Sequence, residues 1–221
     1  MDVLTLAGRG MTTSDQLARW ARRTPAAVAL RCDGVGRTYA ELDERVTRLA
    51  RALAARGVGT GDRVAVLALN GLETWETYLA GVRLGAIVVP VNFRLVADEV
   101  AYVLTDSGAV ALVVDAAMAE VGAKARAQAP GVTTVLTIGE EFEAALADAG
   151  SEPLDVEVDE SAPAFIMYTS GTTGRPKGAV LTHRNLLMHV FSQVTHLGVD
   201  PDDHVLSPRR GHGAMIARGQ R

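Results

Sequence analysis

Between residues 63 and 148 the sequence alternates short apolar runs with amphipathic segments, and this order limits the possible folds more than any other feature. We expect strands at 63–69, 86–91, 109–114 and 132–138, with helices at 72–84, 97–106, 116–127 and 140–148. The strand segments are nearly continuous apolar runs, such as Ala86-Ile87-Val88-Val89. Such runs are typical of parallel strands covered by helices on both faces. The sequence therefore predicts an α/β fold, a three-layer domain with a mostly parallel sheet flanked by helices.

A shorter amino-terminal part precedes this alternation. Thr13 and Ser14 are suited to cap a helix that ends near Arg23, because their hydroxyl oxygens can accept bonds from free backbone N–H groups. The mostly apolar segment 28–32 predicts a strand that ends in a turn. Residues 1–13 show neither pattern, and we expect a disordered N-terminus there.

The clearest helical pattern spans residues 40–56, where apolar residues recur every three or four positions. Glu41 and Arg45 lie one turn apart and are expected to form an ion pair. Gly57 stands where a glycine commonly follows a helix. The glycine-rich segment 57–62 precedes a strand instead of following one, so we interpret it as a helix-to-strand connection and not as a phosphate loop.

The composition lacks the signatures of nucleic-acid-binding and membrane-spanning proteins. The 221 residues are 48% hydrophobic and 22% charged, and the net charge of −4 provides no basic footprint for nucleic acid. No apolar stretch reaches the length of about 18 residues that a membrane span requires. Residues 1–7 are too short and too acidic for a signal peptide. The single cysteine, Cys32, fits a reducing compartment, and we predict a cytoplasmic location.

Residues 168–178 are rich in the residue types that bind phosphate. They read Tyr-Thr-Ser-Gly-Thr-Thr-Gly-Arg-Pro-Lys-Gly and follow the apolar run 164–167. Glycine allows backbone N–H groups to converge on an anion, and hydroxyl groups add further donors. Lysine adds a point charge of the kind that phosphate sites use, and Lys177 is one of two lysines in a chain with twenty arginines. The segment therefore predicts a loop that wraps a polyphosphate.

Three other interpretations of this segment are less favoured. The Walker A motif requires Gly-Lys followed by Ser or Thr, whereas Lys177 lies between Pro176 and Gly178. Gly171 and Gly174 do not have the spacing of a dinucleotide-binding fingerprint. A plain hairpin turn between two strands needs two to five residues, which is much less than this segment offers.

The segment 168–178 resembles, nearly letter for letter, the signature loop of the adenylate-forming (AMP-binding) superfamily. The continuation at 179–186, Ala-Val-Leu-Thr-His-Arg-Asn-Leu, is similar to the segment after this loop in fatty-acid and aryl acid:CoA ligases. The resemblance covers about residues 14–207 and implies a truncated N-terminal domain of such an enzyme. It further implies that a carboxylic acid, expected to be a fatty acid, is activated by ATP and Mg²⁺ as an acyl-adenylate and then transferred to coenzyme A.

The resemblance also implies a role for each residue of the loop. The expected nucleotide-binding residues, which contact the β- and γ-phosphates, are Thr169, Ser170, Gly171, Thr172, Thr173, Gly174 and Lys177. Lys177 is the expected catalytic residue, because its charge opposes that of the departing pyrophosphate. The hydroxyl of Thr169 is expected to reach the metal, Mg²⁺, that accompanies ATP.

Residues 208–221 do not fit the resemblance. In the family a Pro-Leu/Met-Phe-His segment follows the strand that we predict at 203–207, whereas 208–221 contain four arginines and no acidic residue. A shifted reading frame, an early stop after sequence drift, or a basic disordered terminus would each produce such a tail. The adenine-binding segment, the acidic magnesium ligand and the mobile C-terminal domain of the family are not located in the chain. We therefore expect the isolated chain to be inactive, and the alternative function is that of a non-catalytic remnant or nucleotide-binding module.

Three further features receive a structural interpretation. The histidines of segment 183–196 lack accompanying cysteines or carboxylates at metal-ligand spacing. Residues 139–162 carry nine acidic side chains and no basic one, as a solvated surface segment would. Asn70 and Asn92 each follow a predicted strand, where ligands of open α/β sheets bind, but asparagine there is more often a turn former.

Overall fold

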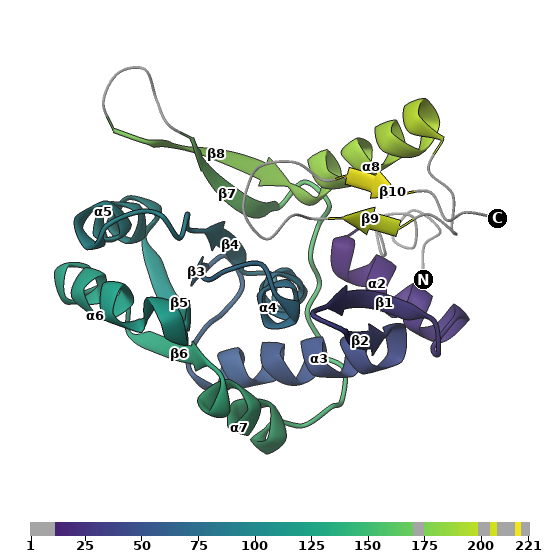
Figure 1. The fold of residues 1–221 in the computed structure, drawn as a ribbon, viewed down its shortest axis with the longest axis horizontal. Coiled ribbons are helices and arrows are strands. Elements are labelled where there is room, and N and C mark those ends of the chain that lie inside the picture. The colour runs from purple at the N-terminus through teal and green to yellow at the C-terminus, as the bar shows by residue number, and fades with distance from the viewer. Residues whose placement is uncertain (1–11, 170–174, 199–203, 207–214, 218–221) are drawn as a thin grey trace.

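The computed structural model describes residues 12–169, 175–198, 204–206 and 215–217, and its centre is a six-stranded sheet with the order β6-β5-β3-β4-β7-β8 (Figure 1). The strands are β3 (Arg63–Leu67), β4 (Ile87–Pro90), β5 (Ala109–Asp115), β6 (Thr134–Ile138), β7 (Pro163–Thr169) and β8 (Lys177–Thr182). Neighbouring strands are parallel except β7 and β8, which form an antiparallel hairpin. The predicted α/β fold with a mostly parallel sheet is confirmed.

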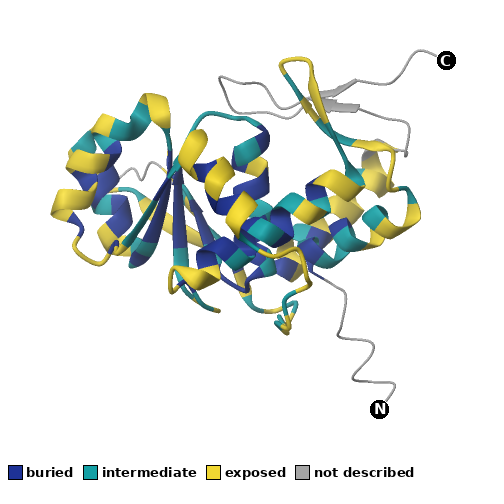
Figure 2. Cartoon of the chain, turned by 90° about the horizontal axis from the view of Figure 1, so that it is seen from below, coloured by how far each residue is buried: buried dark blue, intermediate teal, exposed yellow. Residues whose placement is uncertain are grey.

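Helices cover both faces of this sheet. One face carries α2 (Thr13–Arg23), α3 (Tyr39–Ala55), α4 (Leu72–Arg83) and α7 (Glu140–Asp148), and the other carries α5 (Ala97–Ser107) and α6 (Ala119–Gln128) (Figure 1). Val64 packs in the first cluster and its neighbour Ala65 in the second, because successive side chains of a strand point to opposite faces. Figure 2 shows the resulting pattern, in which buried strands lie between helices whose outer surfaces are exposed.

The first helix begins one residue earlier than predicted. Thr12, and not Thr13 or Ser14, is its N-cap: the Thr12 hydroxyl accepts from the Asp15 backbone N–H at 3.2 Å, and the Asp15 carboxylate accepts from the Thr12 N–H at 3.1 Å. This reciprocal capping box satisfies two free donors at once. Thr12 is buried, so the packed part of the chain begins inside the segment predicted to be disordered; residues 1–11 lie outside the described residues.

The predicted strand at 28–32 is confirmed as β1 (Val28–Cys32), and it pairs with a strand that was not predicted, β2 (Val35–Thr38). The two residues between them, Asp33 and Gly34, have φ values of 49° and 81°. Positive φ at both positions matches the right-handed twist of a two-residue hairpin. The sequence of β2, Val-Gly-Arg-Thr, contains no apolar alternation, which is why its pattern did not indicate a strand.

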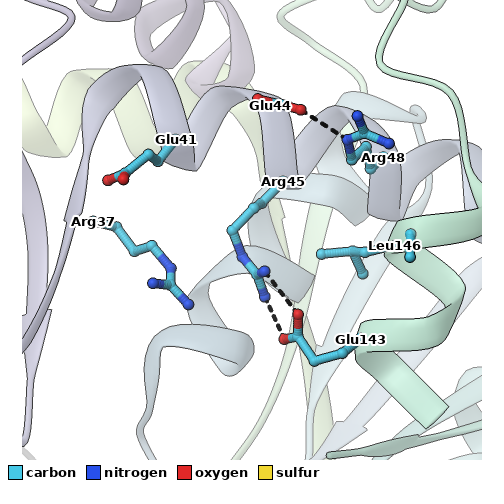
Figure 3. Close-up of a pocket in the computed structure, with 8 residues that line it drawn as sticks. Arg37, Glu41, Glu44, Arg45, Arg48, Glu143 and Leu146 are labelled. Atoms are coloured by element: carbon cyan, nitrogen blue, oxygen red, sulfur yellow. Dashed lines mark hydrogen bonds and ion pairs between the residues drawn. The ribbon is translucent and has the colours of Figure 1, made fainter. Parts of the chain in front are cut away.

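The predicted ion pair between Glu41 and Arg45 is wrong. Glu41 accepts instead from the backbone N–H and hydroxyl of Thr38, at 2.8 and 2.9 Å, and so caps the start of α3. Arg45 donates to Glu76 at 2.6 and 2.8 Å and to Glu143 at 2.9 and 2.6 Å. Figure 3 shows the Arg45 side chain directed toward Glu143 and away from Glu41. The capping role of Glu41 leaves Arg45 free to join α3 to α4 and α7.

The other predicted elements agree with the structure, with small shifts at their ends. The predicted helix at 116–127 begins with a 3-10 turn (Ala116–Met118) before α6. Gly57 follows α3 with a φ of 88°, as the helix-ending position requires, and residues 57–62 connect α3 to β3.

The last part of the described chain contains one long helix and a small sheet. Helix α8 (His183–Leu197) follows β8, and β9 (His204–Leu206) lies within the strand predicted at 203–207. Its antiparallel partner is β10 (Met215–Ala217), which falls inside the predicted basic tail. Nowhere in the described part of the chain is a helix both long and apolar enough to cross a bilayer.

Several large apolar side chains are exposed on β8 and α8. We call this set the α8 apolar surface, and it consists of Val180, Met188, Val190, Phe191 and Val194, which are 47% to 60% exposed. Exposed apolar residues that occur singly need no explanation, but a concentration on one helix and its preceding strand favours association with other apolar surfaces.

Candidate phosphate-binding site

The predicted phosphate loop follows the carboxyl end of β7, at the sheet edge where open α/β folds bind ligands. Strands β3 and β4 run parallel to each other and β4 runs parallel to β7, so all three end at this edge. Asn70 and Asn92 follow β3 and β4 there. The side-chain oxygen of Asn92 accepts from the backbone N–H of Arg94 at 3.0 Å, so Asn92 is the turn former that its position indicated.

Two predicted site residues, Thr169 and Lys177, lie in the described part of the loop region, and they are direct cross-strand partners in the β7–β8 hairpin. Directly opposed residues share a face of the sheet, with Cβ atoms about 4.5–5.5 Å apart. Both residues are exposed. The structure therefore brings the predicted catalytic lysine beside the predicted magnesium ligand. The remaining predicted contacts, Ser170, Gly171, Thr172, Thr173 and Gly174, lie outside the described residues.

The segment 168–178 does belong to a hairpin, an interpretation that its length had disfavoured. The antiparallel ladder includes Tyr168 opposite Gly178 and Thr169 opposite Lys177, so the connection itself consists of residues 170–176. A connection of seven residues is longer than the usual two to five, and it begins and ends at a fixed pair. A hairpin and a phosphate loop are thus not alternatives here, because the strands hold the two ends of the loop.

Gly178 is required by the close packing of its cross-strand neighbours. A Cβ atom at this position would lie 2.6 Å from Cγ2 of Ile166 and 3.2 Å from the ring of Tyr168. The first distance is shorter than a carbon–carbon contact allows, and the second would require the Tyr168 ring to shift slightly. The signal in the sequence is a glycine inside a strand, which often marks the close approach of another group. Gly178 was predicted only as part of the loop, and its packing role was missed.

Helix α5 contacts both ends of the loop through residues that were not predicted to belong to the site. The Tyr168 hydroxyl donates to the Asp106 carboxylate at 2.6 Å, and the Tyr102 hydroxyl donates to the Pro176 carbonyl oxygen at 3.1 Å. The rings of Tyr102 and Tyr168 meet edge to face with centroids 6.5 Å apart. The Arg175 guanidinium lies 5.3 Å from the centre of the Tyr102 ring, within reach of a cation–π interaction.

The Tyr168 hydroxyl keeps its proton in this setting. Burial raises the pKa of Tyr168 well above its usual range, and the hydrogen bond to the Asp106 carboxylate adds to the effect. Removing the proton would place two negative oxygens side by side, and their repulsion disfavours the deprotonated form. Tyr168 is therefore a hydrogen-bond donor to Asp106 throughout the neutral pH range.

His183, the first residue of α8, is fully buried, and neither ring nitrogen has a hydrogen-bond partner among the described residues. Burial lowers the pKa of His183, because a charged imidazolium is poorly solvated inside a protein. His189, farther along α8, is exposed. In the described ranges, no group of three or more His, Cys, Asp or Glu side chains is arranged to hold a metal ion.

A shallow pocket of about 340 Å³ lies between α3 and α7, away from the hairpin (Figure 3). Its lining includes Arg45, Arg48 and Glu143 but neither Thr169 nor Lys177. Arg45 pairs with Glu143 at 2.6 Å, and Arg48 pairs with Glu44 at 2.9 Å. Because these charges neutralise one another, the pocket has the character of a structural ion-pair network and not of a ligand site.

Comparison with known proteins relates the chain to a group of ligases. A family model described as AMP-binding enzyme matches residues 17–209. A feruloyl-CoA synthase of Amycolatopsis sp is 43% identical over 188 residues, which cover 85% of this chain and 37% of the relative. A long-chain-fatty-acid–CoA ligase of Mycobacterium tuberculosis is 36% identical over 198 residues, which cover 86% of this chain and 39% of the relative. The chain thus spans well under half the length of these curated relatives.

Solved structures show the same similarity in three dimensions. A long-chain-fatty-acid-CoA ligase from Archaeoglobus fulgidus superposes with a TM-score of 0.81 at 26% identity, over 88% of this chain and 41% of that one. The N-terminal domain of FACL13 from Mycobacterium tuberculosis gives a TM-score of 0.73 at 34% identity, over 78% of this chain and 44% of that one. The shared part includes the mostly parallel sheet flanked by helices.

Proposed function

The chain belongs to the AMP-binding enzyme family, and we propose that it is the amino-terminal part of an ATP-dependent carboxylic acid:CoA ligase that acts through an acyl-adenylate. One observation carries the proposal: the β7–β8 hairpin sets Lys177 opposite Thr169 at the carboxyl edge of the parallel sheet. We propose a fatty acid as the substrate. The relatives include a fatty-acid ligase and a feruloyl-CoA synthase, so the test must compare an alkyl with an aryl acid.

The first step would be adenylation. A carboxylate oxygen attacks the α-phosphorus of ATP, the bond to the β-phosphate oxygen breaks, and pyrophosphate leaves with the negative charge. We propose that Thr169 to Gly174 cradle the β- and γ-phosphates and that the ammonium group of Lys177 opposes their charge. Donors held in place before the reaction stabilise developing charge without reorganising. Each charge-assisted hydrogen bond would contribute about 1.5–3 kcal/mol.

Magnesium would enter as part of the Mg–ATP substrate. We propose that the exposed hydroxyl of Thr169, at the last residue of β7, reaches this ion, which would help to neutralise the phosphate oxygens. In the second step the thiol of coenzyme A attacks the acyl carbonyl carbon, AMP leaves, and a thioester forms. For the isolated chain we propose phosphate binding without turnover, because it corresponds to 37% and 39% of the two relatives.

A chimera tests the proposal directly. Residues 17–206 of this chain would replace the aligned segment of the M. tuberculosis long-chain ligase, and pyrophosphate release would be followed with palmitate or ferulate, ATP and Mg²⁺. We expect release that depends on the carboxylic acid, followed by acyl-CoA formation, with palmitate favoured. A folded chimera that releases no pyrophosphate with either acid would contradict the function, and preference for ferulate would contradict the substrate. Robust acyl-CoA formation by the 221-residue chain alone would contradict the proposed inactivity of the isolated chain.

A further inference from the structure

We propose that Tyr102 and Asp106 of α5 are positioning residues, which hold both ends of the phosphate loop from behind and so fix the backbone that carries Lys177. The inference rests on the proposed role of the loop in phosphate binding. It assigns a task to α5, a helix that lies outside the loop and contributes no side chain to the proposed phosphate contacts.

Asp106 holds the end at which the chain enters the loop. Its carboxylate accepts from the Tyr168 hydroxyl at 2.6 Å, and Tyr168 immediately precedes Thr169. A hydrogen bond to a carboxylate is stronger than one between neutral groups. Tyr168 also lies against Gly178, the residue after Lys177, because no Cβ atom separates them. One hydrogen bond therefore restrains both strands next to the loop.

Tyr102 holds the end at which the chain leaves the loop. Its hydroxyl donates at 3.1 Å to the carbonyl oxygen of Pro176, which belongs to the peptide group that leads directly into Lys177. The proline ring fixes φ at this residue, so orienting the carbonyl group fixes most of the remaining freedom. Arg175 lies over the ring of Tyr102 at 5.3 Å and extends the contact one residue farther into the loop.

The position of these residues on α5 makes the restraint rigid. Tyr102 and Asp106 are four residues apart and share one face of the helix. The opposite side of α5 is anchored in the core by Val100, Val103 and Leu104, each no more than 1% exposed. These buried residues pack α5 against the sheet, and so they place the backbone of both contact points relative to it.

Side chains alternate between the two faces of the hairpin, so the residues that contact α5 and the residues proposed to contact phosphate lie on opposite faces. Tyr168 points toward α5, so its neighbour Thr169 points to the opposite face, and Lys177 shares that face as the cross-strand partner of Thr169. Helix α5 thus restrains the loop from the side away from the two side chains proposed to contact phosphate and Mg²⁺. Ligand binding does not require these bonds to break.

The test combines amide hydrogen exchange with ligand affinity in the 221-residue chain. Tyr102→Phe and Asp106→Ala each remove one bond. Tyr39→Phe, a tyrosine that stacks on Trp20, and Asp98→Ala, on α5 beside Gln128, are the matched controls. We expect faster exchange in peptides covering 168–178 for the first two variants only. The dissociation constant for inorganic pyrophosphate should rise about two- to tenfold, at an unchanged melting temperature.

The outcomes separate the inference from the function on which it rests. Unchanged exchange in both variants overturns the inference, whatever the ligand data show. Faster exchange with unchanged pyrophosphate affinity also overturns it, while phosphate binding by the loop stands. If the unaltered chain does not bind pyrophosphate, the phosphate role is overturned in this chain and the inference with it. In the chimera, Tyr102→Phe should raise the KM for ATP and leave the KM for the carboxylic acid unchanged, a separation that general destabilisation would not produce.

Discussion

Lys177 lies directly opposite Thr169 across the β7–β8 hairpin, so an ammonium group and a hydroxyl group leave the same face of the sheet at the base of one loop. The antiparallel register of β7 and β8 sets these two residues opposite each other, so their pairing does not depend on the loop between them. Neither side chain is buried, so both can be replaced without opening the core. The chemistry of this site can therefore be tested separately from its folding.

Replacing Lys177 tests the proposed phosphate contact. In the chimera we expect Lys177→Ala to weaken ATP binding by about 10- to 150-fold, which corresponds to one charge-assisted contact of about 1.5–3 kcal/mol. Isothermal titration calorimetry measures the change. The control is Lys124→Ala, which removes the other lysine of the chain, an exposed residue of α6 paired with Glu120 at 2.6 Å. Equal ATP affinity in the two variants would remove Lys177 from the proposed role.

The packing role of Gly178 predicts a loss of stability on adding one methyl group. Gly178→Ala would place Cβ 2.6 Å from Ile166 and so force the hairpin apart, at a cost of about 1–3 kcal/mol in the free energy of unfolding. Urea unfolding measures this cost. Gly36→Ala, in the antiparallel strand β2, is the control, because its Cβ would meet Val28 at an ordinary distance of 3.7 Å. A hairpin that tolerates alanine at 178 as well as at 36 would contradict the packing argument.

The buried ion pair between Arg45 and Glu76 predicts a larger loss of stability than the one expected for Gly178→Ala. Glu76 is fully buried and accepts from Arg45 at 2.6 and 2.8 Å. Glu76→Gln would leave part of the Arg45 charge without its buried partner and lower the free energy of unfolding by about 3–5 kcal/mol. Chemical denaturation should show no measurable loss for Glu120→Gln, the exposed counterpart in α6. Similar losses for the two variants would mean that the buried pair contributes no more than a surface pair.

The buried His183 predicts a pH-dependent stability. Its folded-state pKa lies below the unfolded value of about 6.5, so the unfolded chain takes up a proton that the folded chain does not. The stability that the neutral ring provides is present above pH 6.5 and is lost as the pH falls below it. We expect the free energy of unfolding to decrease between pH 7.5 and 5.5, and less steeply in His183→Gln. An identical slope in the unaltered protein and in His183→Gln would disprove the assignment.

The α8 apolar surface predicts self-association of the isolated chain. Phe191 is 54% exposed, and Val190 beside it is 55% exposed. Apolar surface of this kind is removed from water when chains associate. We expect Phe191→Lys to lower the apparent mass of the chain in size-exclusion chromatography with light scattering. Val96→Lys changes an apolar residue that is 62% exposed before α5, and it should have no such effect. A strictly monomeric unaltered chain would contradict the prediction.

The sequence predicts the sheet and its helices well because strands buried on both faces leave uninterrupted apolar runs. The run from 86 to 91 marks β4 for this reason, although the strand itself ends at Pro90. The residues that cap the helices were predicted less well. Several neighbouring residues have side chains that could cap the same helix as Thr12 or Glu41, and only the folded backbone shows which of them does so. The pattern of β2 is too short and too polar to indicate a strand before its partner is known.

The residues around the phosphate-binding site show more clearly which contacts a sequence pattern cannot predict. A lysine and a threonine in a glycine-rich loop indicate phosphate binding by their residue types alone, as Lys177 and Thr169 do. Tyr102 and Pro176, in contrast, are 74 residues apart, and no local pattern in the sequence links them. Arg45 similarly finds its partners 31 and 98 residues away, instead of the glutamate one turn before it. Such contacts depend on which strands become neighbours, and the order of the strands in the sheet differs from their order in the sequence.

The fixed base of the hairpin determines where insertions and deletions can be tolerated. An added residue within 170–176 would lengthen a loop whose ends are already held, and doubling a loop costs only about 0.6 kcal/mol in closure entropy. An added residue between Tyr168 and Thr169 would reverse every side chain beyond it and turn the threonine toward α5. Closure entropy thus places little limit on the length of the loop, whereas the register of β7 and β8 is fixed by the face on which Thr169 and Lys177 lie.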